Sequence, residues 1–223
     1  MARFARIVVP GYPHHITQRG NRRMGVFFSN ADRTAYLAHM RTACDRYGVE
    51  IWAWCLMGNH VHCVAVPKKE DSLARCFSEA HGKYTRRVNK REGWTGHLWQ
   101  ARFCSSVLDE PHMIAAVRYV ERNPVRAGIA RLPWRYQWSS ARWHTGRVRT
   151  DPLISGDGVL QDLIEDWERY LLDDDDQEFV DRVRTESFVN RPLGGEPFVR
   201  LLERRFGKSL IRKKPGRPAR GMR

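Results

Sequence analysis

Residues 49–66 read VEIWAWCLMGNHVHCVAV, a sequence that predicts two neighbouring strands at the centre of the architecture. Its first part, Val49 to Leu56, alternates in polarity and is rich in aromatic side chains, which is typical of a β-strand. Met57-Gly58-Asn59 then predicts a turn, and His60 to Val66 predicts a second strand that Pro67 ends. Two strands joined by so short a turn indicate neighbours in an antiparallel sheet.

The chain on either side continues this alternation of strands and helices. Upstream we expect a strand at His14 to Arg19 and a helix from Asn30 or Asp32 to about Tyr47. Downstream we expect a helix capped by Asp71 or Ser72, a strand at Arg102 to Leu108 and a helix from about Glu110 to Asn123. The order β-α-β-β-α-β, followed by a helix, predicts an α+β fold in which an antiparallel sheet carries helices on one face.

The composition changes after about residue 147, which divides the chain into three predicted parts. Residues 1–147 form the predicted catalytic domain, and residues 148–207 form a helical extension with a short amphipathic helix at Phe198 to Phe206. Residues 208–223 carry seven basic residues and no acidic one, so we expect a disordered tail. Arg217 in this tail is a candidate for binding in a DNA minor groove; a tail that only improves solubility is the alternative.

The net charge of +14 comes from the first part of the chain. Residues 1–150 contain 25 Lys and Arg against 10 Asp and Glu, whereas residues 151–223 contain 14 against 15. A polyanion such as nucleic acid is the natural partner for that excess, although a solubilising surface is the alternative. No run of 18 apolar residues exists, so we expect no membrane span. We also expect no small-molecule substrate.

The five scattered cysteines form no CxxC pair and are expected to be buried thiols in a reducing cytoplasm. The N-terminal apolar stretch is too short for a secretory signal, which also favours a cytoplasmic location.

His60-Val61-His62 is the first candidate for chemistry. Alternate side chains on a strand share a face, so both imidazoles are expected to point the same way and to form a metal-binding edge. The alternative is a pair of histidines on a solvated strand face.

Tyr119 is the candidate nucleophile, and Asn123 lies one helical turn beyond it on the same face. A core position is the alternative for a tyrosine beside an apolar stripe. A divalent cation would stabilise the charge of a phosphodiester under attack, and the mixed nitrogen and oxygen ligands of such a site suit Mg²⁺ or Mn²⁺. Attack by the phenol would give a covalent phosphotyrosine that a free 3′-hydroxyl can reverse.

Several motifs in order resemble those of the REP-associated tyrosine transposases, relatives of the single-tyrosine HUH transposases of insertion sequences. The motifs are MGNHVH at 57–62, GHLWQARF at 96–103, YVERNPVRAG at 119–128 and WSS at 138–140. This resemblance covers much of residues 10–145. Gly58 departs from it, because relatives often have proline there, and the last ~75 residues match only loosely.

The resemblance implies a ferredoxin-like sheet with the HUH histidines on a central strand. It implies that Tyr119 is the catalytic tyrosine, that Asn123 is the third metal ligand, and that palindrome-derived single-stranded or hairpin DNA is cut to leave a 5′-phosphotyrosine. Exchange of two strands needs two tyrosines, supplied by a homodimer or by two successive rounds.

Basic and aromatic side chains are the candidates for binding this DNA. Trp94, Trp99 and Phe103 are expected to stack on bases or to lie in the core. The candidates for phosphate contact are Arg22, Arg23, Lys83, Arg86, Arg87 and Arg102. Tyr84 is a rival nucleophile, but its place on an apolar stripe favours the core. Two other functions stay open: a non-catalytic DNA- or RNA-binding regulator, and a metallo-hydrolase without a covalent step.

Overall fold

A computed structural model describes residues 6–154 and 160–211 of the chain. Its centre is a four-stranded sheet in the order β2-β3-β1-β4, in which every neighbouring pair is antiparallel. The strands are β1 (His14–Arg19), β2 (Val49–Leu56), β3 (His60–Pro67) and β4 (Cys104–Val107). β1 and β3 are therefore central, and the α+β, ferredoxin-like fold is confirmed.

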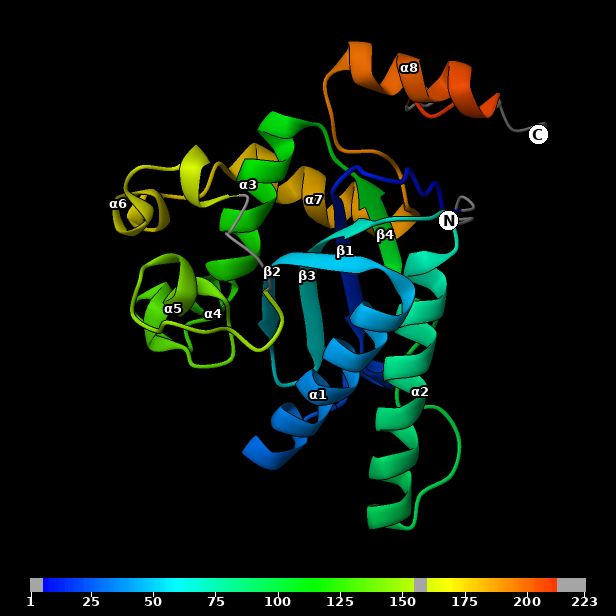
Figure 1. The fold of residues 1–223 in the computed structure, drawn as a ribbon, viewed down its shortest axis with the longest axis vertical. Helices are drawn as coiled ribbons and strands as arrows, with labels where there is room; N and C mark the ends of the chain where they lie inside the picture. Colours follow the sequence, from blue (N-terminus) through cyan, green and yellow to red (C-terminus); the bar gives the residue numbers. More distant parts are fainter. Residues whose placement is uncertain (1–5, 155–159, 212–223) are drawn as a thin grey trace, which may run out of the picture.

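Two long helices cover one face of this sheet (Figure 1). They are α1 (Asn30–Tyr47) and α2 (Ser72–Glu92), and they bury Val61 and the other side chains that point to this face. The N-cap of α1 is Ser29, whose side chain accepts from the backbone N–H of Asp32, so the expected cap at Asn30 or Asp32 was wrong. Asp71 occupies the N-cap position of α2, as predicted, but its side chain makes no capping hydrogen bond. Gly48 ends α1 in the left-handed conformation.

The opposite face of the sheet is also covered, which corrects the expectation of helices on one face only. A second core joins Ala53, Cys55 and Val64 of the sheet to α3 (Glu110–Glu121), α6 (Trp167–Leu172) and α7 (Gln177–Val189). The strand pattern did not predict this layer, because His15 and His62 place polar side chains on this face of the sheet. Polar side chains on one face are typical of a solvated face, but here both are buried. The extension after residue 147 thus shares a core with the preceding part of the chain.

The remaining elements are short. They are α4 (Asn123–Arg126), α5 (Ala141–His144), α8 (Glu196–Phe206) and the 3-10 turns η1 (Asn21–Arg23), η2 (Pro133–Arg135) and η3 (Gln161–Leu163). The helix predicted at 198–206 thus begins two residues earlier. All five cysteines are buried, as predicted. Within the described residues, no helix is long and apolar enough to cross a membrane.

Loop segments bond to both outer strands of the sheet. On β2, the N–H of Leu56 donates to the carbonyl of Trp138, and the N–H of Ser140 donates to the carbonyl of Trp54. On the β4 side, the N–H of Leu193 donates to the carbonyl of Val107 at 2.9 Å. These contacts attach the late part of the chain to the sheet.

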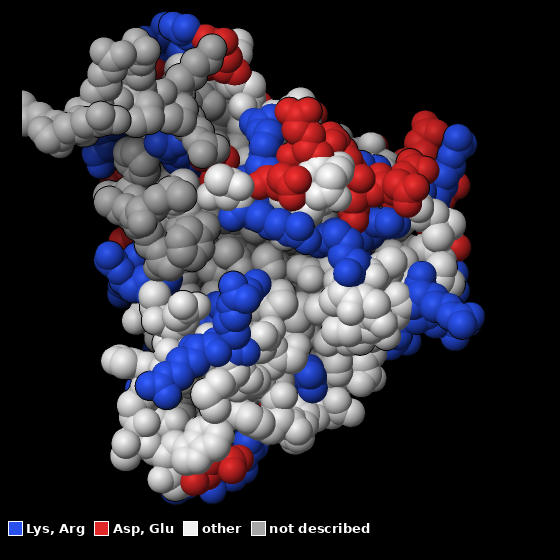
Figure 2. Space-filling model, turned by 180° about the vertical axis from the view of Figure 1, so that it is seen from behind, with Lys and Arg blue, Asp and Glu red and all other residues white. Residues whose placement is uncertain are grey.

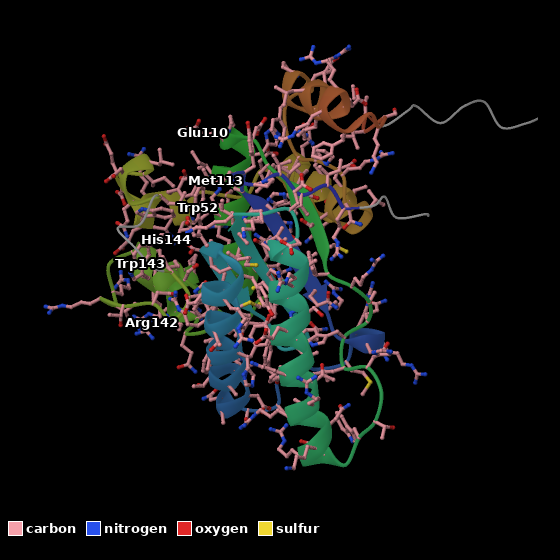
Figure 3. All side chains as sticks on the ribbon, turned by 45° about the vertical axis from the view of Figure 1, so that its right-hand side comes forward. Trp52, Glu110, Met113, Arg142, Trp143 and His144 are labelled. Atoms are coloured by element: carbon pink, nitrogen blue, oxygen red, sulfur yellow. The ribbon has the colours of Figure 1, made fainter. Side chains whose placement is uncertain are left out.

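A buried polar cluster fastens α3 to α5. The carboxylate of Glu121 accepts from Ser140 Oγ and lies 2.6 Å from His144 Nδ1, and none of the three side chains is exposed by more than 3%. His144 in turn stacks on Trp167 of α6 with ring centroids 4.1 Å apart. Figure 3 labels His144 beside Trp143, at the same side of the molecule as Trp52 of β2. This cluster gives the Trp-Ser-Ser motif at 138–140 a structural role.

Candidate active site

The two histidines of β3 lie on one face of the sheet, as their spacing predicted. The ring centroids of His60 and His62 are 4.9 Å apart, and Val61 between them points into the core on the α1 and α2 side. His62 is buried, with 6% of its surface exposed, whereas His60 is partly exposed. Both rings line a cavity of about 680 Å³.

Tyr119 of α3 meets these histidines in the same cavity. Its ring centroid is 5.7 Å from that of His62 in an edge-to-face arrangement, and also 5.7 Å from that of His15 on β1. Residues far apart in the sequence therefore converge on one site.

Asn123 also lines the cavity and is 8% exposed. The helix that was expected to continue to Asn123 instead ends at Glu121, and Asn123 begins the separate turn α4. Pro124 explains the break: a proline is tolerated at the first positions of a helix but not in its interior, where it lacks the N–H that the preceding turn needs. The side-chain amide of Asn123 still lies at the site, although α3 does not continue to this residue.

The Nδ1 atom of each β3 histidine is engaged by a neighbour. His60 Nδ1 lies 2.6 Å from Asn59 Oδ1, and the amide nitrogen of Asn59 donates to the carbonyl of Arg23 at 2.9 Å. His62 Nδ1 lies 3.1 Å from His15 Nε2. In the part of the chain that is described, no hydrogen bond engages the Nε2 atom of His60 or of His62, so both are available as ligands.

Burial keeps these imidazoles neutral at physiological pH. It lowers the pKa of His60 to about 4, with a further contribution from the positive charge of Arg19. Burial also lowers the pKa of His62 well below its usual value, with the neighbouring histidines and Arg126 acting in the same direction. A neutral imidazole is the form that binds a metal.

The donor set fits a divalent cation. Two free Nε2 atoms and the side-chain oxygen of Asn123 would supply nitrogen and oxygen ligands and leave positions open for phosphate. Among the described residues, no group of three His, Cys, Asp or Glu side chains could hold a metal ion. The ligand set of His60, His62 and Asn123 stays a prediction.

The family model for IS200-like transposases matches residues 9–123, more than half of the chain. The chain belongs to this family. The matched segment contains β1, β3 and α3, and thus His60, His62 and Tyr119. The resemblance inferred from the motifs is confirmed at the level of the family.

Two solved structures are similar to this transposase. One, the REP-associated tyrosine transposase bound to a REP hairpin, is 20% identical, covers 71% of this chain and 94% of its own, and has a TM-score of 0.57. This likeness shows a shared fold. The other is described as a transposase of Deinococcus radiodurans R1, with 18% identity, coverage of 54% and 96%, and a TM-score of 0.38. Curated proteins contain no match.

Arg126 is a site residue that the sequence did not single out. Its guanidinium carbon lies 4.0 Å from the centroid of the Tyr119 ring, and it donates to the carbonyl of Tyr119 at 2.5 Å. It also pairs with Asp175, at 3.0 Å, from the linker between α6 and α7. The only signal in the sequence was its place in the motif after Asn123-Pro124. The guanidinium of Arg126 is placed where it can bind the phosphate that Tyr119 would attack.

The predicted phosphate-binding residues of the transposase fall into three groups. Arg23 and Arg102 line the cavity that holds Tyr119, and Arg22 is exposed beside Arg23 in η1. Arg86 and Arg102 line a second cavity of about 770 Å³, next to exposed Arg87. Lys83 instead forms an ion pair with Glu79 at 2.7 Å. Arg217 lies outside the described residues.

Charge on the surface of the transposase is unevenly distributed. On the face shown in Figure 2, groups of Lys and Arg side chains border a patch of acidic ones. Arg22 and Arg23 both adopt positive φ angles, 51° and 62°, which cost non-glycine residues of the order of 1 kcal/mol each. Such strain tends to persist at functional positions, and here it presents two arginines at the edge of the site.

Trp99 is not a free stacking platform, which corrects its assignment to DNA binding. It is 7% exposed, and its ring stacks on His81 at 4.4 Å within the core beneath α1 and α2. Phe103 is also a core residue. Of the three aromatic candidates only Trp94 is exposed, at 44%, and it packs edge-to-face against Phe28, another exposed ring that the sequence did not single out.

Proposed function

We propose that this transposase cuts and rejoins single-stranded DNA through a covalent bond to Tyr119, using a divalent cation held by His60, His62 and Asn123. The observation that carries the proposal is the edge-to-face contact between the Tyr119 ring and the His62 ring, at 5.7 Å, inside a cavity that Asn123 also lines. A nucleophile and metal ligands around one cavity are what phosphodiester transfer requires.

Each residue would have a distinct role. The cation, when bound, polarises a phosphoryl oxygen and stabilises the charge of the transition state. The Tyr119 oxygen forms a bond to phosphorus, and the bond from phosphorus to the 3′ oxygen breaks. The proton that the phenol loses balances the one that the departing 3′-hydroxyl gains. Arg126, against the Tyr119 ring, would hold the phosphate.

The products would be a 5′-phosphotyrosine and a free 3′-hydroxyl. The covalent bond conserves the energy of the phosphodiester, so a 3′-hydroxyl from the same or another strand can attack it and rejoin the DNA. This reversibility distinguishes a strand transferase from the alternative metallo-hydrolase.

We infer that the substrate is a hairpin or the single strand beside one. A protein of the same fold is described as bound to a REP hairpin. In this chain, arginines surround the site cavity, and the exposed Trp94 and Phe28 can stack on unpaired bases.

The decisive experiment replaces Tyr119 with phenylalanine. The purified full chain is incubated with MnCl₂ and a labelled single-stranded palindrome, and covalent protein–DNA adducts are separated on a denaturing gel. We expect an adduct with the wild type and none with Tyr119→Phe. The phenylalanine ring preserves the packing against His62 and Arg126, so hairpin binding should persist in the variant.

The same assay separates the alternatives. Cleavage that survives Tyr119→Phe supports a metallo-hydrolase, and tight binding without cleavage by the wild type supports a regulator. Chelation by EDTA should abolish the adduct while leaving most of the salt-sensitive binding. Leu210 is buried in a core that includes Val107, so the predicted disordered tail does not begin at residue 208. Deletion of residues 212–223, including Arg217, should weaken affinity more than it slows the chemistry; unchanged affinity would count against a DNA role for the tail.

A further inference from the structure

His15 of β1 connects the β3 histidines to the C-terminal extension. It is 1% exposed, and its Nε2 lies 3.1 Å from His62 Nδ1. Its other ring nitrogen, Nδ1, lies 2.8 Å from the hydroxyl oxygen of Ser187 on α7, which is 2% exposed. The three side chains thus form a buried hydrogen-bonded chain from helix to strand to strand.

Proton positions in this chain are interdependent. A neutral imidazole carries one N–H, so each ring donates at one nitrogen and accepts at the other. If His62 is to offer the lone pair of Nε2 to a cation, its proton must be on Nδ1. His15 then accepts at Nε2, carries its own proton on Nδ1, and donates that proton to Ser187.

The opposite arrangement of protons would prevent His62 from binding the cation. A proton on His15 Nε2 would be donated to His62 Nδ1, which would move the His62 proton to Nε2 and occupy the position that the cation needs. The Ser187 hydroxyl can accept from His15 Nδ1 or donate to it, so it holds the His15 ring beside His62 and permits the order of protons that a cation on His62 requires.

We propose that His15 and Ser187 are positioning residues that fix the ring orientation of His62 for a divalent cation. The proposal rests on the proposed function, because it assumes that His62 is a ligand. Such outer contacts typically account for a 10- to 100-fold difference in metal affinity. Ser187 lies well beyond residues 9–123, so this metal site would depend on a segment outside the family match.

The attachment of α7 to the sheet supports this role. Asn190, which ends α7 in the left-handed conformation, accepts from the backbone N–H of Ser105 on β4 at 3.0 Å. Ser187 is three residues, or about one turn, before this anchor. The hydroxyl is therefore held at a fixed position above β1 and is not carried on a loose helix end.

The experiment measures Mn²⁺ binding to the full-length chain by isothermal titration calorimetry. We expect Ser187→Ala to weaken binding by about 10- to 100-fold, and His15→Leu by at least as much. His15→Gln should stay within a few-fold of the wild type, because its side-chain oxygen can accept from His62 Nδ1. The matched control is Ser106→Ala: Ser106 lies opposite His15 on β4, is 1% exposed, and its hydroxyl has no hydrogen-bond partner among the described residues. This control should bind like the wild type.

Nitrogen NMR of the metal-free protein supplies a second measurement. We expect sharp His62 ring signals in the wild type and signals broadened by ring motion in Ser187→Ala. Wild-type affinity together with wild-type His62 signals in folded Ser187→Ala would overturn this inference alone. A wild type that binds no Mn²⁺ would overturn the metal-dependent function and the inference together.

Discussion

Tyr84 and Tyr119 show how surroundings separate two tyrosines that the sequence offered as rival nucleophiles. Tyr84 is fully buried, its hydroxyl donates to the carbonyl of Val26 at 2.5 Å, and burial raises its pKa well above the usual value. Tyr119 lines a cavity together with the three histidines His15, His60 and His62 and several arginines. A phenol that is buried and bonded to the backbone has no access to DNA, so Tyr84 is a core residue, as its apolar stripe predicted.

Replacement of Tyr84 by phenylalanine should therefore affect stability and leave the chemistry intact. The change leaves the carbonyl of Val26 without its buried donor, and we expect a loss of about 1–2 kcal/mol in the free energy of unfolding. Urea unfolding measures that loss, and the adduct assay should give the wild-type yield. A folded Tyr84→Phe protein that forms no adduct would contradict the assignment of the nucleophile to Tyr119.

The sequence predicted the central part of the site and missed its surroundings. His60 and His62 are two residues apart on a strand, so their common face follows from the strand repeat alone. His15 contacts His62, which is 47 residues away in the sequence, and Ser187, which is 172 residues away. No local sequence pattern predicts such contacts. Trp99 was assigned to DNA binding because its neighbours are basic, whereas its burial depends on α1 and α2 closing over it.

At the scale of elements, α2 carries basic side chains with different surroundings. Lys83 pairs with Glu79, which also accepts from Arg46 and from Tyr47. Arg86, one turn further along, is exposed and lines the second cavity. Helical spacing predicted that both would lie off the apolar stripe. The partner of Lys83, Glu79, lies one turn earlier on α2 itself, whereas the contacts of Glu79 with Arg46 and Tyr47 of α1 could not be predicted from the spacing.

Arg86→Gln should weaken binding of single-stranded DNA and lower the salt dependence of that binding. Loss of one phosphate contact reduces the slope of log K against log salt by about 0.7. Lys83→Gln is the matched control with a much smaller expected change, because its charge already has a partner. Fluorescence anisotropy at several salt concentrations tests this, and equal slopes in the two variants would exclude Arg86 from the DNA interface.

The linker between α6 and α7 contains Asp175, which forms an ion pair with Arg126 at the site. Asp175 contacts both Arg122, at 3.3 Å, and Arg126, at 3.0 Å. Because Asp175 competes with phosphate for Arg126, we expect Asp175→Asn to raise the affinity for single-stranded DNA about fivefold, from an interaction of ~1 kcal/mol. Asp174→Asn is the control, since its carboxylate is fully exposed and lies 3.9 Å from Arg122. The proposed competition is refuted if both variants bind like the wild type.

At the scale of the whole molecule, buried neutral histidines make stability depend on pH. Burial lowers the pKa of His14 to about 4 and the pKa values of His15 and His81 to about 3. In the unfolded chain these groups titrate near pH ~6.5. Below that pH the unfolded chain binds protons that the folded chain does not, so stability is complete above pH ~6.5 and decreases as the pH falls toward about 4.

Urea unfolding at pH 7.5 and pH 5.0 should detect this decrease. Each of the three histidines contributes up to about 1.4 kcal/mol per pH unit within the window. His81→Gln should reduce the slope, although it also removes the bond to the Tyr36 hydroxyl. The exposed His97 provides a control, and His97→Gln should leave the slope unchanged. Equal stability at the two pH values would contradict the prediction.

The order of strands and helices followed from local patterns, but the second layer of the molecule did not. The pattern at α3 predicted a helix with an apolar stripe, and nothing nearby in the sequence indicated that α6 and α7 would return to cover the same face. Those contacts depend on the folding of the whole chain, so the boundary near residue 147 marks a change in composition and not the end of the core.

The loop bonds on β2 and β4 constrain how two copies could associate. A second molecule could extend the sheet only by pairing a strand with β2 or β4. It would then have to displace Trp138 and Ser140 from β2, or Leu193 from β4. The same loops disfavour aggregation by edge-to-edge pairing of β-strands. We therefore expect any dimer of this chain to use surfaces other than these two sheet edges.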